Sequence, residues 1–391
     1  MKKIALLLAA SASVVACSDT SNPTNPGIAP QLAVSAASEN ADVIPGRFIV
    51  TLRAGERPAA IAAAHGVKPD FVYTTVLNGF AGSMSEAARD GLLRDARVQR
   101  VEQDGIARAS TIQLGATWGI DRIDQRALPL STSYTYTNTG SGVTAYIIDT
   151  GIRFDHSEFG TRASSGFDAV DGGSADDCNG HGTHVSGTVG GVTYGVAKSV
   201  TLKAVRVLDC GGSGTWSGVI AGMDWVAANH ATPAVANMSL GGGANTSVDD
   251  AVRGMITSGV TTAVAAGNGN QGGRAQDACN YSPARVLEAI TVGATDKTDT
   301  KTSWSNYGNC VDIFAPGLGI TSAWYTSTTA TNTISGTSMA TPHVAGVVAL
   351  YLQSYPTASP ATVASALSAN ATQGIVKNSK TTKNNLLFTN Y

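Results

Sequence analysis

The chain of 391 residues carries little charge. Charged residues make up only 14% of it, and the two signs nearly cancel to a net charge of −2. Nucleic acids and anionic membrane surfaces attract proteins with a basic excess, so this balance gives no support for either partner. The 44 glycines and the 43% of hydrophobic residues are instead typical of a compact, loop-rich protein with a sizeable core. At this length the chain can hold two or three domains.

Long apolar runs are also missing. No stretch beyond the N-terminus approaches the roughly 18 consecutive apolar residues that a membrane-spanning helix needs. At the N-terminus, Lys2 and Lys3 precede a short apolar run at 4–10, and small residues then lead to Cys17. This order predicts a secretory signal over residues 1–17, with a buried N-terminal helix as the alternative. We therefore expect a secreted, extracellular protein.

The end of this signal has a pattern of its own. The segment Val14-Val15-Ala16-Cys17 is similar to the lipid-attachment box of bacterial lipoprotein signals, in which small residues precede an acylated cysteine. Residues 18–42, rich in Ser, Asn and Pro, are typical of a flexible linker. The precursor is then expected to be anchored to a membrane through Cys17. An ordinary signal peptide cut near Ala16 is the alternative.

Cysteines are few, and the spacings typical of zinc sites are absent. Neither CxxC nor HExxH occurs in the sequence. Apart from Cys17 there are four cysteines, which suit disulfides in an oxidising compartment. Four cysteines can pair in three ways, and the sequence alone does not choose among them. The four are Cys178, Cys210, Cys279 and Cys310.

Residues 43–110 predict a small α+β domain. Strand-like and helix-like segments follow one another in the order βαββαβ, which is typical of a ferredoxin-like sandwich. A domain of about 65 residues is marginally stable by itself, so we expect it to need a partner surface. The strands are expected at 47–52, 71–76, 79–84 and 98–102, and the helices at 57–64 and 86–96.

Residues 111–391 predict a larger α/β domain. Near-continuous apolar runs, as expected of strands covered on both faces, alternate with segments of helical spacing. Strand followed by helix, repeated, predicts a parallel β-sheet flanked by helices, and such sheets form their sites at the carboxyl ends of strands. The runs lie at 143–148, 200–207, 234–240, 260–266 and 289–292.

Three polar residues lie where elements of this domain are expected to begin or end. Asp149 follows a buried strand, His181 opens a helix-like stretch of small residues, and Ser338 opens another helix. Each has a plain structural interpretation when taken alone, as a strand-end carboxylate, a structural histidine and a helix N-cap. Together, in the order Asp, His, Ser, they supply the acid, the base and the nucleophile that acyl transfer requires.

The segments that hold these residues match one family. Residues 149–152 (Asp-Thr-Gly-Ile), 181–184 (His-Gly-Thr-His) and 336–340 (Gly-Thr-Ser-Met-Ala) resemble the subtilases, most closely their proteinase K and aqualysin branch. The similarity extends through nearly all of residues 111–391. It implies a subtilisin-like fold and a serine endopeptidase that works through an acyl-enzyme.

The resemblance implies a role for each residue of the site. Asp149 is the acid, His181 the general base and Ser338 the nucleophile. Asn268 follows a buried strand and a glycine, which by itself is typical of a turn, but in the family an Asn here donates to the developing oxyanion. Two Gly-rich strands are implied to bind an extended peptide in the cleft. They contain Gly212, Ser213, Gly214, Ser239, Leu240 and Gly241.

The same resemblance implies how the cysteines pair and what the small domain does. Cys178 pairs with Cys210, and Cys279 pairs with Cys310. The domain at 43–110 is similar to the family's inhibitor-like propeptide, which templates folding, lies across the cleft and is removed by self-cleavage. The mature enzyme is expected to be a monomer that acts on proteins and peptides.

Structural calcium is implied by the resemblance and not by a ligand loop. One site matches Asp312 together with the backbone carbonyls near Leu287 and Ala289. Carboxylates and carbonyls are the hard oxygen ligands that Ca²⁺ prefers. A second site, of the aqualysin type, matches residues whose alternative role is a solvated helix start: Asp121, Asp124, Gln125, Ser131 and Ser133.

Two rival functions are disfavoured by the sequence. An α/β-hydrolase esterase needs G-x-S-x-G and the chain order Ser, Asp, His, whereas Ser338 is followed two residues later by Ala340. A non-catalytic binding module on the same scaffold would lack a triad residue or Asn268, and all four are present. The cleft segments contain no charge, which predicts broad specificity with a preference for an apolar or aromatic residue before the cut.

Overall fold

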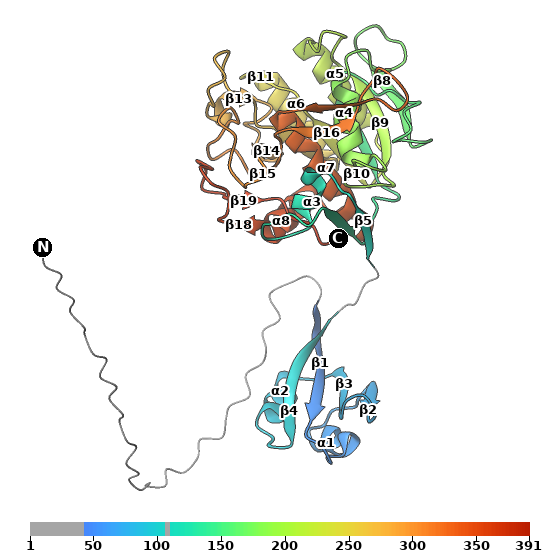
Figure 1. Cartoon of the computed structure of the whole chain (residues 1–391), viewed down its shortest axis with the longest axis vertical. Coiled ribbons are helices and arrows are strands. Elements are labelled where there is room, and N and C mark those ends of the chain that lie inside the picture. Colours follow the sequence, from blue (N-terminus) through green and yellow to red (C-terminus); the bar gives the residue numbers. More distant parts are fainter. Residues whose placement is uncertain (1–42, 106–109) are drawn as a thin grey trace, which may run out of the picture. The chain divides into compact units, whose positions relative to one another are not determined.

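The computed structural model describes residues 43–105 and 110–391 (Figure 1). They form two compact units that meet in sequence at 106–109, and each unit has its own sheet and its own core. The expected signal sequence, the linker at 18–42 and Cys17 lie outside the described residues. So does the end of the expected propeptide at 106–109.

The smaller unit is a four-stranded antiparallel sheet packed against helices. Its strands pair in the order β2-β3-β1-β4. Val50 and Val101 of the sheet are buried in one cluster with the helix residues Ile61 and Leu92. The elements are β1 Val43–Leu52, α1 Pro58–Ala64, β2 Phe71–Tyr73, β3 Gly79–Ser83, α2 Glu86–Leu93 and β4 Val98–Gly105.

The order of these elements agrees with the order expected from the sequence, although some bounds differ. The second strand ends at Tyr73, because the chain bends immediately afterwards. The last strand continues to Gly105, where it pairs with Val43. Helix α2 begins after Ser85, whose hydroxyl accepts a hydrogen bond of 3.2 Å from the Ala88 N–H and so caps the helix.

The larger unit alternates strands with helices. Its strands are β5 Thr111–Leu114, β6 Ser133–Tyr136, β7 Thr144–Asp149, β8 Ala163–Asp168, β9 Thr201–Arg206, β10 Ala234–Met238, β11 Gly242–Gly243, β12 Thr261–Ala265, β13 Tyr281–Ser282, β14 Ile290–Thr295, β15 Ile313–Pro316, β16 Ile320–Ala323, β17 Thr331–Ile334, β18 Thr372–Gln373 and β19 Asn385–Leu386. Its helices are α3 Trp118–Ile123, α4 His181–Gly190, α5 Trp216–Asn229, α6 Thr246–Thr257, α7 Thr337–Ser354, α8 Pro360–Asn370 and the short 3-10 helix η1 Ala278–Asn280. Over 43–105 and 110–391, no helix combines the length and the apolar character needed to cross a membrane.

A nine-stranded sheet forms the centre of this unit, in the order β18-β19-β15-β14-β12-β10-β7-β9-β8. Its paired strands are parallel except for β18 and β19. Ala145 and Ile147 of β7 pack with residues of α4 and α7, whereas Tyr146 and Ile148 pack with residues of α5 and α6. Helices therefore cover both faces, which explains the continuous apolar runs and confirms the expected α/β fold.

Four strands of this sheet are not apparent in the sequence: β8, β15 and the two-residue strands β18 and β19. The edge strand β8 has the sequence Ala-Ser-Ser-Gly-Phe-Asp, and its side chains are only partly buried, so no apolar run marks it. The strand β15 has four residues, which is too short for a periodic pattern to show.

Candidate active site

Asp149 and His181 form a hydrogen-bonded pair at the carboxyl ends of the central strands. Asp149 is the last residue of β7, and His181 is the first residue of α4. The imidazole Nδ1 lies 2.8 Å from the carboxylate Oδ1. The same oxygen accepts a hydrogen bond of 2.7 Å from the Thr150 N–H. Because Asp149 is fully buried, its carboxylate holds the imidazole in one orientation.

Burial and charge act in opposite directions on His181. Burial lowers the pKa of the imidazole, whereas the charge and hydrogen bond of Asp149, with a smaller contribution from Asp177, raise it. The resulting pKa lies above the ordinary value of 6.5. A histidine in this range can accept and return a proton near neutral pH, as general-base catalysis requires.

The start of α4 is fixed by Asp177, which the sequence did not reveal as a site residue. The carboxylate joins the strand end that bears Asp149 to the helix start that bears His181, and so sets their separation. Its nearest signal in the sequence is an acidic residue shortly before the Asn-Gly of a turn. Its two oxygens accept five hydrogen bonds of 2.6–2.9 Å from Thr150, Asn179, Gly180 and Thr183.

The approach of α4 to the strand end requires glycine. A Cβ at Gly182 would lie 2.1 Å from the carbonyl oxygen of Gly151, so no side chain fits at this position. The residue before the helix, Gly180, has φ of 111°, a left-handed conformation that favours glycine. The Gly-His-Gly sequence is therefore explained by backbone geometry on both sides of His181.

Ser338 is the second residue of α7 and lines the same cleft as His181. Its hydroxyl donates to the Ser239 carbonyl at 3.1 Å, and the Ser239 hydroxyl donates to the Ser338 carbonyl at 2.8 Å. In the part of the chain that the structure describes, no hydrogen bond joins Ser338 to His181, so the expected contact between nucleophile and base is not made in this conformation. Such contacts often tighten only when substrate binds.

Asn268 lies just after β12 and presents an amide to this cleft. Its Oδ1 accepts hydrogen bonds from the Thr337 N–H at 2.8 Å and from the Thr337 hydroxyl at 2.9 Å. These two donors fix the orientation of the carboxamide. Its Nδ2 has no acceptor among the described residues and is left to donate to a bound ligand.

The loop that carries Asn268 is held by Asn306, a second residue that the sequence did not reveal. Asn306 Nδ2 donates to the Ala266 carbonyl at 2.8 Å. Its Oδ1 accepts from the N–H groups of Gly269 at 3.1 Å and Gln276 at 2.8 Å. Because this side chain is only 1% exposed, its three hydrogen bonds place the loop firmly.

A cleft of 680 Å³ brings the expected substrate-binding residues together with His181, Ser338 and Asn268. Small and apolar side chains, including Trp216 and Leu240, supply much of its lining. No Asp, Glu, Lys or Arg of the described residues lines it. The residues expected from the sequence that lie on it are Gly212, Ser213, Gly214, Ser239, Leu240 and Gly241.

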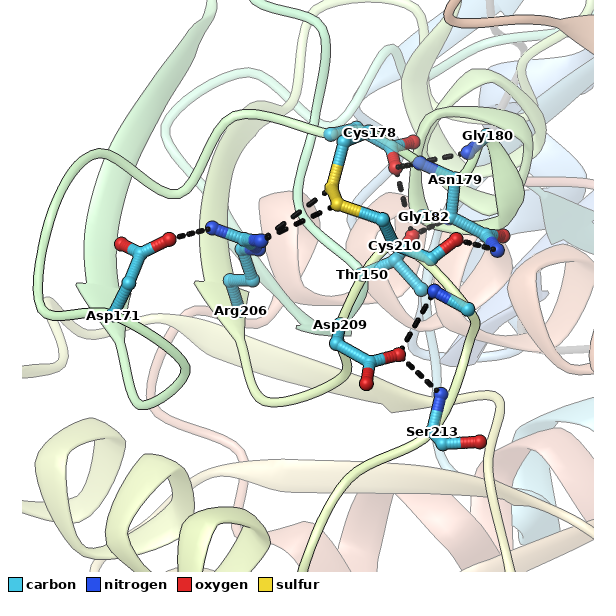
Figure 2. The surroundings of a disulfide bond; sticks show 12 residues. Thr150, Asp171, Cys178, Asn179, Gly180, Gly182, Arg206, Asp209, Cys210 and Ser213 are labelled. Atoms are coloured by element: carbon cyan, nitrogen blue, oxygen red, sulfur yellow. Dashed lines mark hydrogen bonds and ion pairs between the residues drawn. A yellow bond between two sulfur atoms is a disulfide. The ribbon is translucent and has the colours of Figure 1, made fainter.

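The described residues contain two disulfides, and their pairing is the one that the resemblance implied. Cys178 is bonded to Cys210, and Cys279 is bonded to Cys310. The first links the loop that leads into His181 to the segment that follows β9, as Figure 2 shows. The segment that leads to His181 and one edge of the cleft are therefore joined covalently.

The cleft edge near this disulfide is also held by hydrogen bonds (Figure 2). Asp209 Oδ1 accepts from the N–H groups of Gly211 at 2.9 Å and Ser213 at 3.0 Å. Asn179 Nδ2 donates to the Cys210 carbonyl at 3.0 Å. The Gly-rich segment is thus kept in one shape despite its glycines.

His184 and His343 are not part of the Asp149–His181 pair. Both are buried, and each ring is bonded to a backbone carbonyl. A ring nitrogen of His184 donates to the Ile320 carbonyl at 2.9 Å, and Nδ1 of His343 donates to the Met339 carbonyl at 2.9 Å. Burial lowers the pKa of each to about 4, so both are neutral near pH 7. Neither is suited to accept a proton from Ser338.

Asp121 and Asp124 have features that fit a bound cation. The oxygens of Asp121 accept from the N–H groups of Ser131 at 3.1 Å and Thr132 at 2.8 Å. Asp124 Oδ2 accepts from the Thr135 N–H at 2.6 Å, but its Oδ1 is buried with no partner among the described residues. Burial, and after it the charge of Asp121, raises the pKa of Asp124 to about 6. A buried, unpartnered carboxylate oxygen beside a second carboxylate suits Ca²⁺.

The other residues expected at this calcium site lie nearby. The Gln125 Oε1 accepts from the Ser131 N–H at 3.1 Å, and the hydroxyls of Ser131 and Ser133 are 2.8 Å apart. The described residues contain no group of three or more His, Cys, Asp or Glu side chains placed to hold a metal ion. A cation here would therefore need hydroxyl, amide or backbone oxygens in addition to the two carboxylates.

The calcium site expected at Asp312 does not fit the structure. The Lys383 Nζ donates to Asp312 Oδ1 at 2.6 Å, and the Thr291 N–H donates to Oδ2 at 2.9 Å. Leu287 and Ala289 line the same pocket, as expected. Both carboxylate oxygens nevertheless already have donors, and one donor is an ammonium group. In this structure neither carboxylate oxygen of Asp312 is left without a donor.

The fold and the site together define the class of protein. The starts of α4 and α7 bring an imidazole and a hydroxyl to one cleft, beside an amide that two hydrogen bonds hold, and the end of β7 places a buried carboxylate against the imidazole. This set of groups is that of a serine hydrolase.

Comparison with known proteins narrows this class. Residues 140–388 match the subtilase family. The chain is 57% identical over 363 residues to an extracellular serine proteinase of Thermus sp. (strain Rt41A), with 90% of this chain and 87% of the relative covered. It is 51% identical over 335 residues to the alkaline serine exoprotease A of Vibrio alginolyticus, with 84% and 61% covered.

A solved structure gives the same result. The crystal structure of a cold adapted subtilisin-like serine proteinase shares 56% sequence identity with this chain at a TM-score of 0.68, covering 70% of this chain and 98% of that one. The protein belongs to the subtilase family and is a subtilisin-like serine peptidase.

Proposed function

We propose that this peptidase is an endopeptidase that cleaves proteins through an acyl-enzyme, with Ser338 as nucleophile, His181 as general base and Asp149 as the acid that orients the base. The observation that carries the proposal is the 2.8 Å hydrogen bond between His181 and Asp149 in the cleft that Ser338 also lines. Hydrolysis of casein by the purified enzyme, abolished in Ser338→Ala, tests it.

The chemistry follows from these positions. Ser338 Oγ adds to the carbonyl carbon of the peptide bond while His181 Nε2 takes the hydroxyl proton. The negative charge on the former carbonyl oxygen is stabilised by the Asn268 amide and by the N–H of Ser338 at the start of α7. The C–N bond then breaks as His181 returns the proton to the leaving amine. A water molecule repeats the sequence and releases the acid.

Substrate binding is assigned to the two cleft segments. A peptide in extended conformation would pair its backbone with residues 212–214 and 239–241, where glycines allow close approach. The cleft has no charged lining residue, and Trp216 and Leu240 add apolar surface. These features support broad specificity with a preference for an apolar or aromatic side chain before the cleaved bond.

The unit at 43–105 is assigned the role of propeptide. The alignment with the Thermus relative is longer than the larger unit, so it includes sequence before residue 110. The unit would assist folding, inhibit the mature enzyme and be removed by cleavage near residue 110, leaving a monomer. Accumulation of uncut precursor in Ser338→Ala supports this role, and maturation of that variant without another protease would contradict it.

Export and anchoring concern residues outside the described structure. The sequence over residues 1–17 supports secretion, and Cys17 is proposed as a lipid attachment site that holds the precursor at a membrane until cleavage frees the enzyme. The Ser338→Ala precursor, expressed in bacteria with labelled fatty acid, should take up label, and Cys17→Ala should not. Absence of label from the precursor would leave ordinary secretion.

Structural calcium is proposed at Asp121 and Asp124. When bound, the ion would supply positive charge to the buried Asp121 and to Asp124, whose Oδ1 is buried with no partner among the described residues. Asp121 and Ser131 would fix α3 to the segment before β6. The role is stabilisation of the fold and not catalysis, because neither residue lines the cleft.

A further inference from the structure

Asp312 has an ion pair whose partner is distant in sequence. Lys383 lies in the segment before β19, 71 residues further along the chain, and its Nζ is 2.6 Å from Asp312 Oδ1. The other oxygen accepts from the Thr291 N–H of β14 at 2.9 Å. The Asp312 carbonyl also accepts from Asn385 Nδ2 at 3.1 Å. Asp312 is therefore contacted by two other segments, β14 and residues 383–385.

The negative charge of Asp312 is balanced by the ammonium group of Lys383. Asp312 and Lys383 line a pocket of 450 Å³, and no other Asp, Glu, Lys, Arg or His of the described residues lines it. Ca²⁺ binds through six to eight oxygen ligands and favours sites with excess negative charge. An ammonium on the only lining carboxylate removes that excess and repels a second cation.

The ammonium group of Lys383 also links the segment before β19 to Asp312. Strand β19 pairs with β15 through a single register pair, Phe314 with Leu386, and the Leu387 N–H donates to the Phe314 carbonyl at 2.8 Å. This ladder to β15 is short, although β19 also pairs with β18 and Leu386 is fully buried. Lys383 adds an ionic contact two residues before this strand begins.

We propose that Lys383 is a built-in cation that replaces calcium at Asp312 and ties the C-terminal strand β19 to the central sheet without a metal ion. The enzyme then has one region that responds to calcium, at Asp121 and Asp124, and one that does not. Its stability without calcium depends on Lys383, and Asp312 contributes no calcium ligand in the natural sequence.

The test counts bound calcium on mature enzyme that has been inactivated with a sulfonyl fluoride to prevent autolysis. After removal of calcium with EGTA and equilibrium dialysis against excess Ca²⁺, the natural protein and Asp312→Asn should hold equal numbers of ions per chain. Lys383→Gln should hold one more, because the carboxylate is then free. Loss of one ion in Asp312→Asn, or no gain in Lys383→Gln, would overturn the proposal.

Thermal unfolding in EGTA provides a second readout on the same variants. Lys383→Gln should lower the folding equilibrium constant by about two- to fivefold, the range for partly exposed ion pairs, and excess Ca²⁺ should reverse the loss. The exposed Lys297 is the matched control, and Lys297→Gln should change neither readout. Equal stability of Lys383→Gln and Lys297→Gln in EGTA would show that the ammonium does not stabilise this end of the chain.

Discussion

The His181 imidazole and the Asp149 carboxylate are joined by a hydrogen bond of 2.8 Å between Nδ1 and Oδ1, and the carboxylate is fully buried. This bond uses Nδ1, so Nε2 remains available for a group bound in the cleft that His181 lines. Asp177 fixes the start of α4 through five further hydrogen bonds. The orientation of the His181 imidazole is therefore set without a bound substrate.

Replacement of Asp149 should remove that orientation. Asp149→Asn keeps the shape of the side chain but can hold the imidazole in the wrong tautomer, so kcat should fall by about 10⁴, the size seen in other serine proteases including a subtilisin. The acid limb of kcat/KM in the natural enzyme should lie above pH 6.5, because the pKa of His181 is raised and the base is lost on protonation as pH falls. In Asp149→Asn the limb should move to lower pH.

Steady-state kinetics across pH on both proteins measures these effects. Circular dichroism of Asp149→Asn serves as the control for folding. A variant that retains more than a tenth of the natural kcat, or an acid limb that does not move, would contradict the role given to Asp149.

Asn268 should act only on the transition state. Asn268→Ala removes the amide that Thr337 holds in place, and kcat should fall by about 10²–10³ with little change in KM. The range comes from the corresponding donor of subtilisin, a relative of this protein. Asn270, on the same loop and outside the cleft lining, is the matched control. A raised KM with unchanged kcat in Asn268→Ala would mean that the residue shapes the cleft instead.

The lining of the cleft predicts substrate preference. A peptide library should be cut after many residues, with apolar and aromatic side chains favoured before the cut, because no charged group lines the cleft to select a charged side chain. Cleavage profiles by mass spectrometry measure the preference. Cuts confined to positions after Arg or Lys would require a carboxylate that the cleft does not contain.

Calcium removal should destabilise the fold through Asp121 and Asp124. At a hundredfold excess over Kd, a bound ion adds about 2.7 kcal/mol to the free energy of unfolding, which corresponds to about 5–10 °C in Tm. Excess EGTA should lower the Tm of fluoride-inactivated enzyme by this amount. Asp124→Asn should have a low Tm that no longer responds to calcium. A full calcium response in Asp124→Asn would place the ion elsewhere.

The sheet and the three principal site residues could be predicted because each leaves a local pattern. Apolar runs of strand length mark β7, β10 and β12, and the site residues follow at element ends where side chains converge. The edge strand β8 lacked such a run because its side chains are only partly buried. Its presence is decided by pairing with β9.

The supporting contacts could not be predicted, because they join distant segments. Asn306 reaches Ala266 across 40 residues, and Lys383 reaches Asp312 across 71. Nothing near Lys383 in the sequence distinguishes it from a solvated surface lysine. The family resemblance carries over Asp312 as a ligand position, but it does not reveal the lysine that contacts the carboxylate.

The role of Ser338 as the nucleophile is tested most directly by covalent labelling. The mature enzyme is treated with an organophosphonyl fluoride, digested with a second protease and mapped by mass spectrometry. Loss of activity should track one adduct per chain, located on Ser338, and the adduct should be absent in Ser338→Ala and formed far more slowly in Asp149→Asn. Complete inactivation with the adduct on another residue, or full activity with Ser338 labelled, would contradict it.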